Sequence, residues 1–125
     1  MRSVRSDDAP APVGPYSQAV VRDGLIFVSG QIPLDPATGH LVDGDIEIQI
    51  RRVMENLRAV LRAAGADLSH VLRTGIYLTD LDDFQRANAV YAEFFPDEPQ
   101  PARSTVQVAA LPLGARVEVD CIAHS

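Results

Sequence analysis

The sequence predicts an α+β fold, in which a mixed β-sheet carries two helices packed on one face. Apolar and polar residues alternate in some segments, as in half-buried strands, and recur every three or four residues in two others, as in amphipathic helices. The predicted order is β-β-α-β-α-β-β, and strand pairs mixed with two helices form a two-layer sandwich. With 125 residues, the chain can bury one hydrophobic core. We therefore expect a single domain over residues 1–125.

The first third of the chain is expected to contain a hairpin and a loop. Residues 1–12, with alternating Ala and Pro at the end, are interpreted as a loose N-terminal arm. Residues 16–21 and 25–29 are predicted strands on either side of Arg22-Asp23-Gly24, because Asp-Gly between apolar runs favours a tight turn. The Pro, Gly and Asp residues of segment 33–43 predict a loop.

The apolar spacing then changes to that of a long helix. Asp45 is the expected N-cap, and Gly65 stands where a left-handed residue ends a helix. The apolar face comprises Ile46, Ile50, Val53, Met54, Leu57, Val60, Leu61 and Ala64. Residues 71–78 follow as a strand, with Ile76 and Leu78 on one face.

A second helix is predicted after Asp80, its expected N-cap, with acidic residues in the first turn. Its apolar stripe comprises Phe84, Ala87, Tyr91, Phe94 and Phe95. Three prolines from Pro96 onward end this helix, and strands are predicted over 104–108 and 116–123. Apolar residues remain on the sheet face opposite the helices, and a homo-oligomer would cover them.

The composition excludes several chemistries. All 11 basic residues are arginine, so there is no lysine for a Schiff base or a P-loop. The net charge of −6 disfavours nucleic acid as a partner. One cysteine, the absence of a signal-peptide pattern and the absence of a run of ~20 apolar residues predict a cytoplasmic protein without a membrane span.

Arg103 is the first candidate for a functional residue. It follows the stiff segment Pro99-Gln100-Pro101-Ala102 and opens a strand. A planar guanidinium on a rigid mount suits bidentate recognition of a carboxylate. The alternative is a surface arginine that caps a loop.

Other polar residues also have two interpretations. Asn88, within the apolar stripe of the second helix, is either a satisfied core amide or a group that faces a polar cavity. Asp120 is either a functional residue or a residue on the solvent-facing side of an edge strand. Tyr16 is either a functional residue or a packing residue. Cys121 lies on an apolar strand face and is interpreted as a core residue. The three histidines lack ligand spacing, so no metal site is expected.

An ordered set of motifs resembles the RidA family, also called the YjgF/YER057c/UK114 family, from about Ala9 to Ala123. The motifs are Gly14-Pro15-Tyr16-Ser17-Gln18-Ala19, Phe27-Val28-Ser29-Gly30-Gln31-Ile32-Pro33, Pro101-Ala102-Arg103-Ser104-Thr105 and Val117-Glu118-Val119-Asp120. Asn56-Leu57, Ala64-Gly65, the run Asp80 to Phe84, Asn88 and Tyr91 agree as well. The resemblance implies a chorismate-mutase-like fold, a homotrimer and ligand clefts between neighbouring subunits.

The activity implied by the resemblance is hydrolysis of reactive 2-imino and enamine acids, of the 2-aminoacrylate or 2-iminopropanoate type, to 2-keto acids and ammonia. No metal or organic cofactor is implied, because an iminium carbon is already electrophilic. Two alternatives remain: a non-catalytic binding or regulatory module for small 2-keto or related carboxylic acids, and an endoribonuclease or translation inhibitor, which the acidic composition disfavours. A chaperone-like role has no sequence signature.

The resemblance also implies roles for individual residues. Arg103 would bind the substrate carboxylate, Asp120 would hold the attacking water, and Tyr16 would contribute to the catalytic cleft. The implied lining residues are Ser29, Gly30, Asn88 and Thr105. The members best known for imine hydrolysis carry glutamate where we place Asp120, and a cysteine is often found at the position of Thr105.

Overall fold

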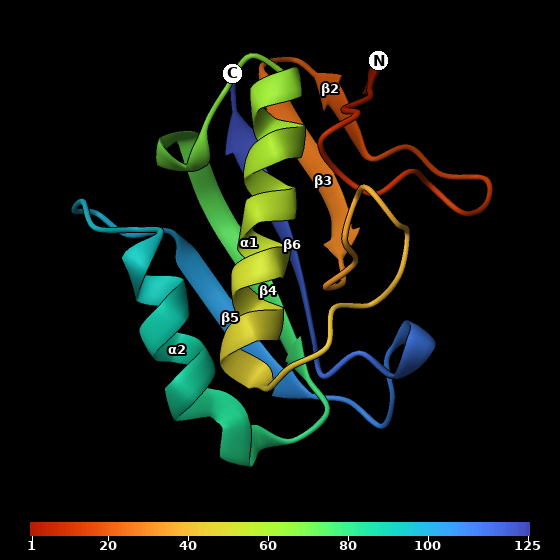
Figure 1. The fold of residues 1–125 in the computed structure, drawn as a ribbon. Coiled ribbons are helices and arrows are strands. Elements are labelled where there is room, and N and C mark those ends of the chain that lie inside the picture. The colour runs from red at the N-terminus through yellow and green to blue at the C-terminus, as the bar shows by residue number, and fades with distance from the viewer.

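The computed structural model describes residues 1–125, in which two α-helices cover one face of a mixed six-stranded sheet (Figure 1). The order in the sheet is β1-β2-β3-β6-β4-β5, and β4 and β5 form its parallel pair. The strands are β1 (Arg2–Val4), β2 (Ala19–Arg22), β3 (Leu25–Gln31), β4 (Val71–Leu78), β5 (Ala102–Gln107) and β6 (Val117–His124). The helices are α1 (Ile46–Ala63) and α2 (Phe84–Glu93). The predicted α+β architecture is confirmed.

The N-terminal residues are not a loose arm, and this part of the prediction was wrong. Strand β1 pairs antiparallel with β2, and Val4 is buried. The buried side chain of Gln18 accepts a hydrogen bond from Ser6 N at 2.6 Å and donates one to Pro10 O at 2.9 Å. These bonds satisfy backbone groups that have no strand partner, so a single amide side chain orders the segment.

The β2–β3 hairpin forms where it was predicted. Asp23 and Gly24 both have positive φ, 51° and 78°, as expected for an Asp-Gly turn whose twist matches that of the strands. Strand β2 begins only at Ala19, later than predicted, whereas β3 continues to Gln31. The pairing of β3 with β6 shifts between Val28 and Gln31, which indicates a bulge there.

Helix α1 packs its apolar face on the sheet and forms the centre of the core. Asp45 caps it, accepting a hydrogen bond from Ile48 N at 3.1 Å, and Gly65 follows it with a φ of 84°. Both termini therefore agree with the prediction. Neither α-helix is long and apolar enough to cross a membrane.

Helix α2 starts later than predicted because a short 3₁₀ helix, Leu81–Asp83, precedes it. Asp80 caps this 3₁₀ helix by accepting a hydrogen bond from Asp82 N. Asp83 is buried, and both of its oxygens accept hydrogen bonds of 2.9 Å from Arg116 Nη2. This ion pair ties the start of α2 to the residue before β6.

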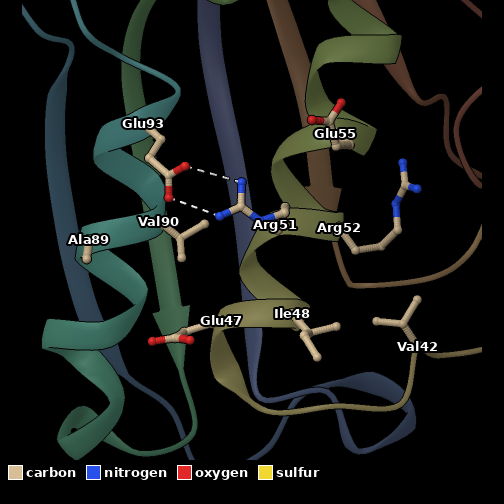
Figure 2. A pocket seen from close by; sticks show the side chains of 9 residues that line it. All are labelled: Val42, Glu47, Ile48, Arg51, Arg52, Glu55, Ala89, Val90 and Glu93. Carbon is tan, nitrogen blue, oxygen red and sulfur yellow. Dashed lines mark hydrogen bonds and ion pairs between the residues drawn. The ribbon is translucent and has the colours of Figure 1, made fainter.

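A second ion pair joins the two helices across a groove of about 630 Å³ (Figure 2). Arg51 of α1 donates to both carboxylate oxygens of Glu93 in α2, at 3.4 and 2.9 Å. Because Val90 of the same α2 face is buried, the packing below the ion pair is apolar. The two ion pairs hold α2 at both ends, and α2 carries Asn88.

Asn56 is the most deeply buried polar side chain of α1, and we expect its replacement to destabilise the fold. Its amide donates to Ile32 O at 3.3 Å and to Leu34 O at 3.0 Å, in the loop after β3. The variant Asn56→Ala would leave Leu34 O without a partner and Ile32 O with only its bond from Leu34 N, so we expect a loss of about 1–3 kcal/mol of unfolding free energy in chemical denaturation. The exposed substitution Gln85→Ala is the control. An equal effect of both would contradict the assigned role of Asn56.

Candidate functional site

Arg103 lies on the edge strand β5, beside helix α2. In the parallel register it is opposite Thr74, whose buried side chain faces the helices, so the side chain of Arg103 also lies on the helix-covered face. Arg103 Nη1 donates a hydrogen bond to Asn88 Oδ1 at 2.6 Å. Both residues were predicted site residues, and the structure brings them together.

Two aromatic rings of α2 hold the guanidinium in place. Its central carbon lies 5.1 Å from the ring centre of Tyr91 and 5.6 Å from that of Phe84, within the range of cation–π interactions. The hydroxyl of Tyr91 shares a 2.8 Å hydrogen bond with Thr74, which fixes the ring. Burial raises the pKa of the Tyr91 hydroxyl, so this group stays neutral.

Arg103 forms no ion pair within the chain, and most of its donors are free for an external anion. Six other arginines each pair with a carboxylate. Arg103 instead opens onto a cleft of about 450 Å³, which we call the Arg103 cleft. Its lining comprises Asn88, Tyr91, Ala92, Phe95, Gln100, Pro101 and Arg103.

Thr105 follows Arg103 by two residues and therefore shares its face of β5. Its hydroxyl oxygen is buried and has no hydrogen-bond partner in the chain. Such a group is costly unless a water or a ligand satisfies it. Thr105 does not line the Arg103 cleft.

Three other predicted residues, Tyr16, Ser29 and Gly30, line a second cavity of about 540 Å³ at the end of β3. We call it the Tyr16 cavity. It is lined by Pro10, Ala11, Val13, Tyr16, Gln18, Ser29, Gly30, Gln31, Ile32, Leu34, Pro112, Leu113 and Glu118. The ring of Tyr16 is half exposed, and its hydroxyl accepts a 3.3 Å hydrogen bond from Val13 N. Tyr16 is thus a cavity residue and not part of the core.

Ser29 and Gly30 lie in the bulge of β3 and have different parts in this cavity. The hydroxyl of Ser29 donates to Ser17 O at 2.6 Å, which ties the Tyr16 segment to β3. A side chain at Gly30 would collide with Glu118, because an added Cβ would lie 2.5 Å from Glu118 Oε2. Gly30 therefore makes room for a carboxylate.

Glu118 is the functional candidate that the sequence analysis missed. It lies on β6, half-buried in the Tyr16 cavity, and receives no hydrogen bond from the chain. Burial, and secondarily the negative charge of Asp120, raise the pKa of its carboxyl above the ordinary value. Strand alternation puts both carboxylates on one face of β6, so the sequence pattern could not distinguish them.

Asp120, the carboxylate singled out from the sequence, lies elsewhere on the same face. It does not line the Tyr16 cavity and is paired with Gly75 of β4. Tyr77 donates a 3.0 Å hydrogen bond to Asp120 Oδ2, and this bond raises the pKa of the tyrosine. Asp120 is therefore held by its own chain, whereas Glu118 is free.

Within one chain the predicted residues form two groups on opposite faces of the sheet. Arg103 faces the helices, whereas Glu118 pairs with Tyr77 on the face that the helices leave uncovered. One chain therefore supplies an arginine without an ion pair and a carboxylate without a hydrogen bond, but at separate cavities.

Neither the cysteine nor the histidines form a reactive centre. Cys121 is buried in the core, and burial raises the pKa of its thiol to about 12. The ring of His70 accepts a backbone hydrogen bond at the start of a 3₁₀ helix and packs against His124. No group of three or more His, Cys, Asp or Glu side chains is placed to hold a metal ion.

The chain is similar to named proteins over nearly its whole length. It is 58% identical over 126 residues to "Protein DfrA" of Myxococcus xanthus, covering 99% of this chain and 95% of that protein. It is 50% identical over 120 residues to "Reactive Intermediate Deaminase A, chloroplastic" of Arabidopsis thaliana, covering 96% of this chain and 64% of the relative.

Solved structures are also similar to the chain, in both sequence and fold. RidA of an Antarctic Psychrobacter shares 42% of its sequence with the chain and superposes with a TM-score of 0.95, covering all of both chains. TdcF of Escherichia coli, solved with bound serine, shares 37% with a TM-score of 0.94, covering 100% of this chain and 99% of its own.

A match to a protein-family model covers nearly the whole chain, including residues of both cavities. A family model described as "Endoribonuclease L-PSP" matches residues 6–125. This range includes Tyr16, Arg103 and Glu118, and the resemblance identified from the sequence is confirmed. The chain therefore belongs to the Endoribonuclease L-PSP family, to which the RidA proteins and the reactive intermediate deaminases also belong.

Proposed function

We propose that the protein hydrolyses small 2-imino and enamine carboxylic acids to 2-keto acids and ammonia. The observation that carries the proposal is Arg103, which has no carboxylate partner and is oriented by Asn88 and two aromatic rings. A fixed guanidinium of this kind suits the carboxylate of a small acid. The deaminase name of one relative and the serine bound to TdcF, itself a small carboxylic acid, support the same substrate class.

The site is completed between two subunits, with the Arg103 cleft of one chain beside the Tyr16 cavity of its neighbour. The separation of the two groups by the sheet supports this arrangement, because neither cavity alone contains both an arginine and a free carboxylate. The uncovered sheet face exposes the large apolar side chains of Leu25, Phe27 and Val106. A homotrimer that buries this face is the proposed assembly.

In the proposed reaction, Arg103 binds the substrate carboxylate and fixes the position of the imine carbon. The Glu118 carboxylate accepts a proton from a water molecule while the water oxygen adds to that carbon. With the substrate in its iminium form, the tetrahedral intermediate carries a hydroxyl and an amino group, and Glu118 returns its proton to the nitrogen. The C–N bond then breaks as the C=O bond forms, ammonia leaves, and the hydroxyl proton passes to solvent. One water is consumed for each ammonia released.

Glu118 takes the role that the sequence analysis gave to Asp120. Glu118 is free in the cavity, whereas Asp120 is bonded to Tyr77, and this contrast supports the reassignment. Asp120, at the position where imine-hydrolysing relatives are expected to carry glutamate, is then a neighbouring charge.

Replacement of Arg103 should strongly reduce both substrate binding and turnover. Two charge-assisted hydrogen bonds are lost in Arg103→Ala, so we expect kcat/KM for ammonia release from an imino acid generated in situ to fall by about 10²–10³-fold. Arg103→Lys should recover little, because lysine lacks the planar fork. Arg5→Ala, at an exposed arginine that has no ion pair and lines neither cavity, is the control.

Two other outcomes of this experiment decide against parts of the proposal. Full activity of Arg103→Ala would refute the arginine assignment. Binding of pyruvate that depends on Arg103, without ammonia release above background, would establish the non-catalytic binding module instead.

Variants of the two carboxylates on β6 separate their roles. We expect Glu118→Gln to lower kcat by about 10²–10⁴-fold, because the amide cannot accept the proton. Asp120→Asn should retain most of the activity, since Asp120 lies outside the cavity. The reverse result would restore Asp120 as the base. Both substitutions preserve side-chain size, and circular dichroism checks that both variants fold.

The pH dependence provides an independent test of Glu118. Its pKa is raised, so activity that needs the carboxylate should decline, as the pH falls, at a higher pH than an ordinary glutamate would give. Asp120→Asn removes the neighbouring charge and should move this decline to lower pH. The pH profile of kcat/KM measures the shift, and an unchanged profile would show that Glu118 is not the titrating group.

A further inference from the structure

Leu113, at the mouth of the Tyr16 cavity, has a backbone conformation that leucine rarely adopts. Its φ of 59° and ψ of 19° lie in the left-handed region. Glycine or asparagine is favoured there, because the Cβ of other residues crowds the backbone. Leu113 is nevertheless 72% exposed, so its side chain contributes little to the core. Burial therefore does not explain a leucine at this position.

Leu113 belongs to an apolar wall that the proposed chemistry does not use. Val13, Ile32, Leu34 and Pro112 line the same cavity, and they come from three separate segments of the chain. The segment with Leu113 is the short 3₁₀ helix Pro112–Gly114, just before β6. Backbone strain that packing does not explain is common where a ligand is held.

We propose that Leu113 is a specificity-determining residue, which closes the Tyr16 cavity around an apolar substrate side chain of about four carbons. This inference rests on the proposed function and adds its substrate class: 2-imino acids of the leucine type are preferred over those of the alanine type.

The size of the cavity supports a large side chain. Its volume of about 540 Å³ lies within the range of small-molecule sites. An alanine-type imino acid has six non-hydrogen atoms, and at roughly 30 Å³ each, the volume of a water molecule, it would fill about a third of this space. Such a small acid would leave most of the cavity unfilled, so part of the apolar wall would have no contact with it.

The test compares ammonia release from imino acids generated in situ from leucine and from alanine. Leu113→Gly suits the left-handed backbone but removes the wall, and Leu113→Asn suits the same backbone but makes the wall polar. In both variants we expect the leucine-to-alanine ratio of kcat/KM to fall about tenfold. The alanine value should stay within about twofold of wild type, and the melting temperature of Leu113→Gly should not decrease. Leu81→Asn, at another exposed leucine, is the control.

Three results would overturn the inference: an unchanged ratio, a ratio near one in the wild type, or an equal loss with both substrates. An equal loss together with altered sedimentation would show that Leu113 packs against another copy of the chain.

If the wild type releases ammonia from neither substrate, the proposed function fails, and calorimetric binding of the 2-keto acids of leucine and alanine decides the inference. A preference for the larger acid that Leu113→Asn removes would support Leu113 as the wall of a binding site. Equal binding of the two acids, or no binding, would refute it.

Discussion

The register of β6 between β3 and β4 determines which side chains reach the sites. Val117, Val119 and Cys121 point into the core, so the alternate residues Glu118 and Asp120 must lie on the opposite face. A shift by one residue would bury both carboxylates and expose the core residues. The apolar packing of β6 under α1 therefore fixes the chemistry on the other face of the sheet.

Two glycines of neighbouring strands make this arrangement sterically possible. Gly30 of β3 lies beside Glu118, and Gly75 of β4 lies beside Asp120, whose Oδ1 would be 2.6 Å from an added Cβ. The two carboxylates differ in their partners, because Tyr77 bonds to one and nothing in the chain bonds to the other. In similar steric settings, one carboxylate is thus bonded to its own chain and the other has no hydrogen-bond partner there.

Much of the fold could be predicted because its signals are local. The cap at Asp45, the turn at Asp23-Gly24 and the apolar period of α1 each depend on residues close in sequence. The order of the N-terminal segment depends on Gln18, a buried amide twelve residues away from its partner Ser6, and spacing does not reveal such a contact. A long-range polar contact of this kind requires the folded chain.

The residues of the candidate site could be named from the sequence, but their grouping could not. Arg103 lies beside Asn88, and Tyr16 and Gly30 line a separate cavity, whereas the resemblance implied one cleft; their roles stay predictions. Whether Glu118 or Asp120 lies in the Tyr16 cavity depends on the pairing of β6 with β3, which shifts at the bulge of β3. The alternation of residues along β6 alone does not reveal this pairing. Leu113 could not be identified from the sequence, because its proposed role rests on a backbone angle of the folded chain.

The burial of Cys121 also has a practical consequence. A thiol with a pKa of about 12 is almost entirely protonated in neutral solution, and reagents that require a thiolate do not modify it. The chain contains no other cysteine. A cysteine introduced at the rim of either cavity would therefore be the single labelling site, and a fluorophore or spin label there could report ligand entry without background from the native protein.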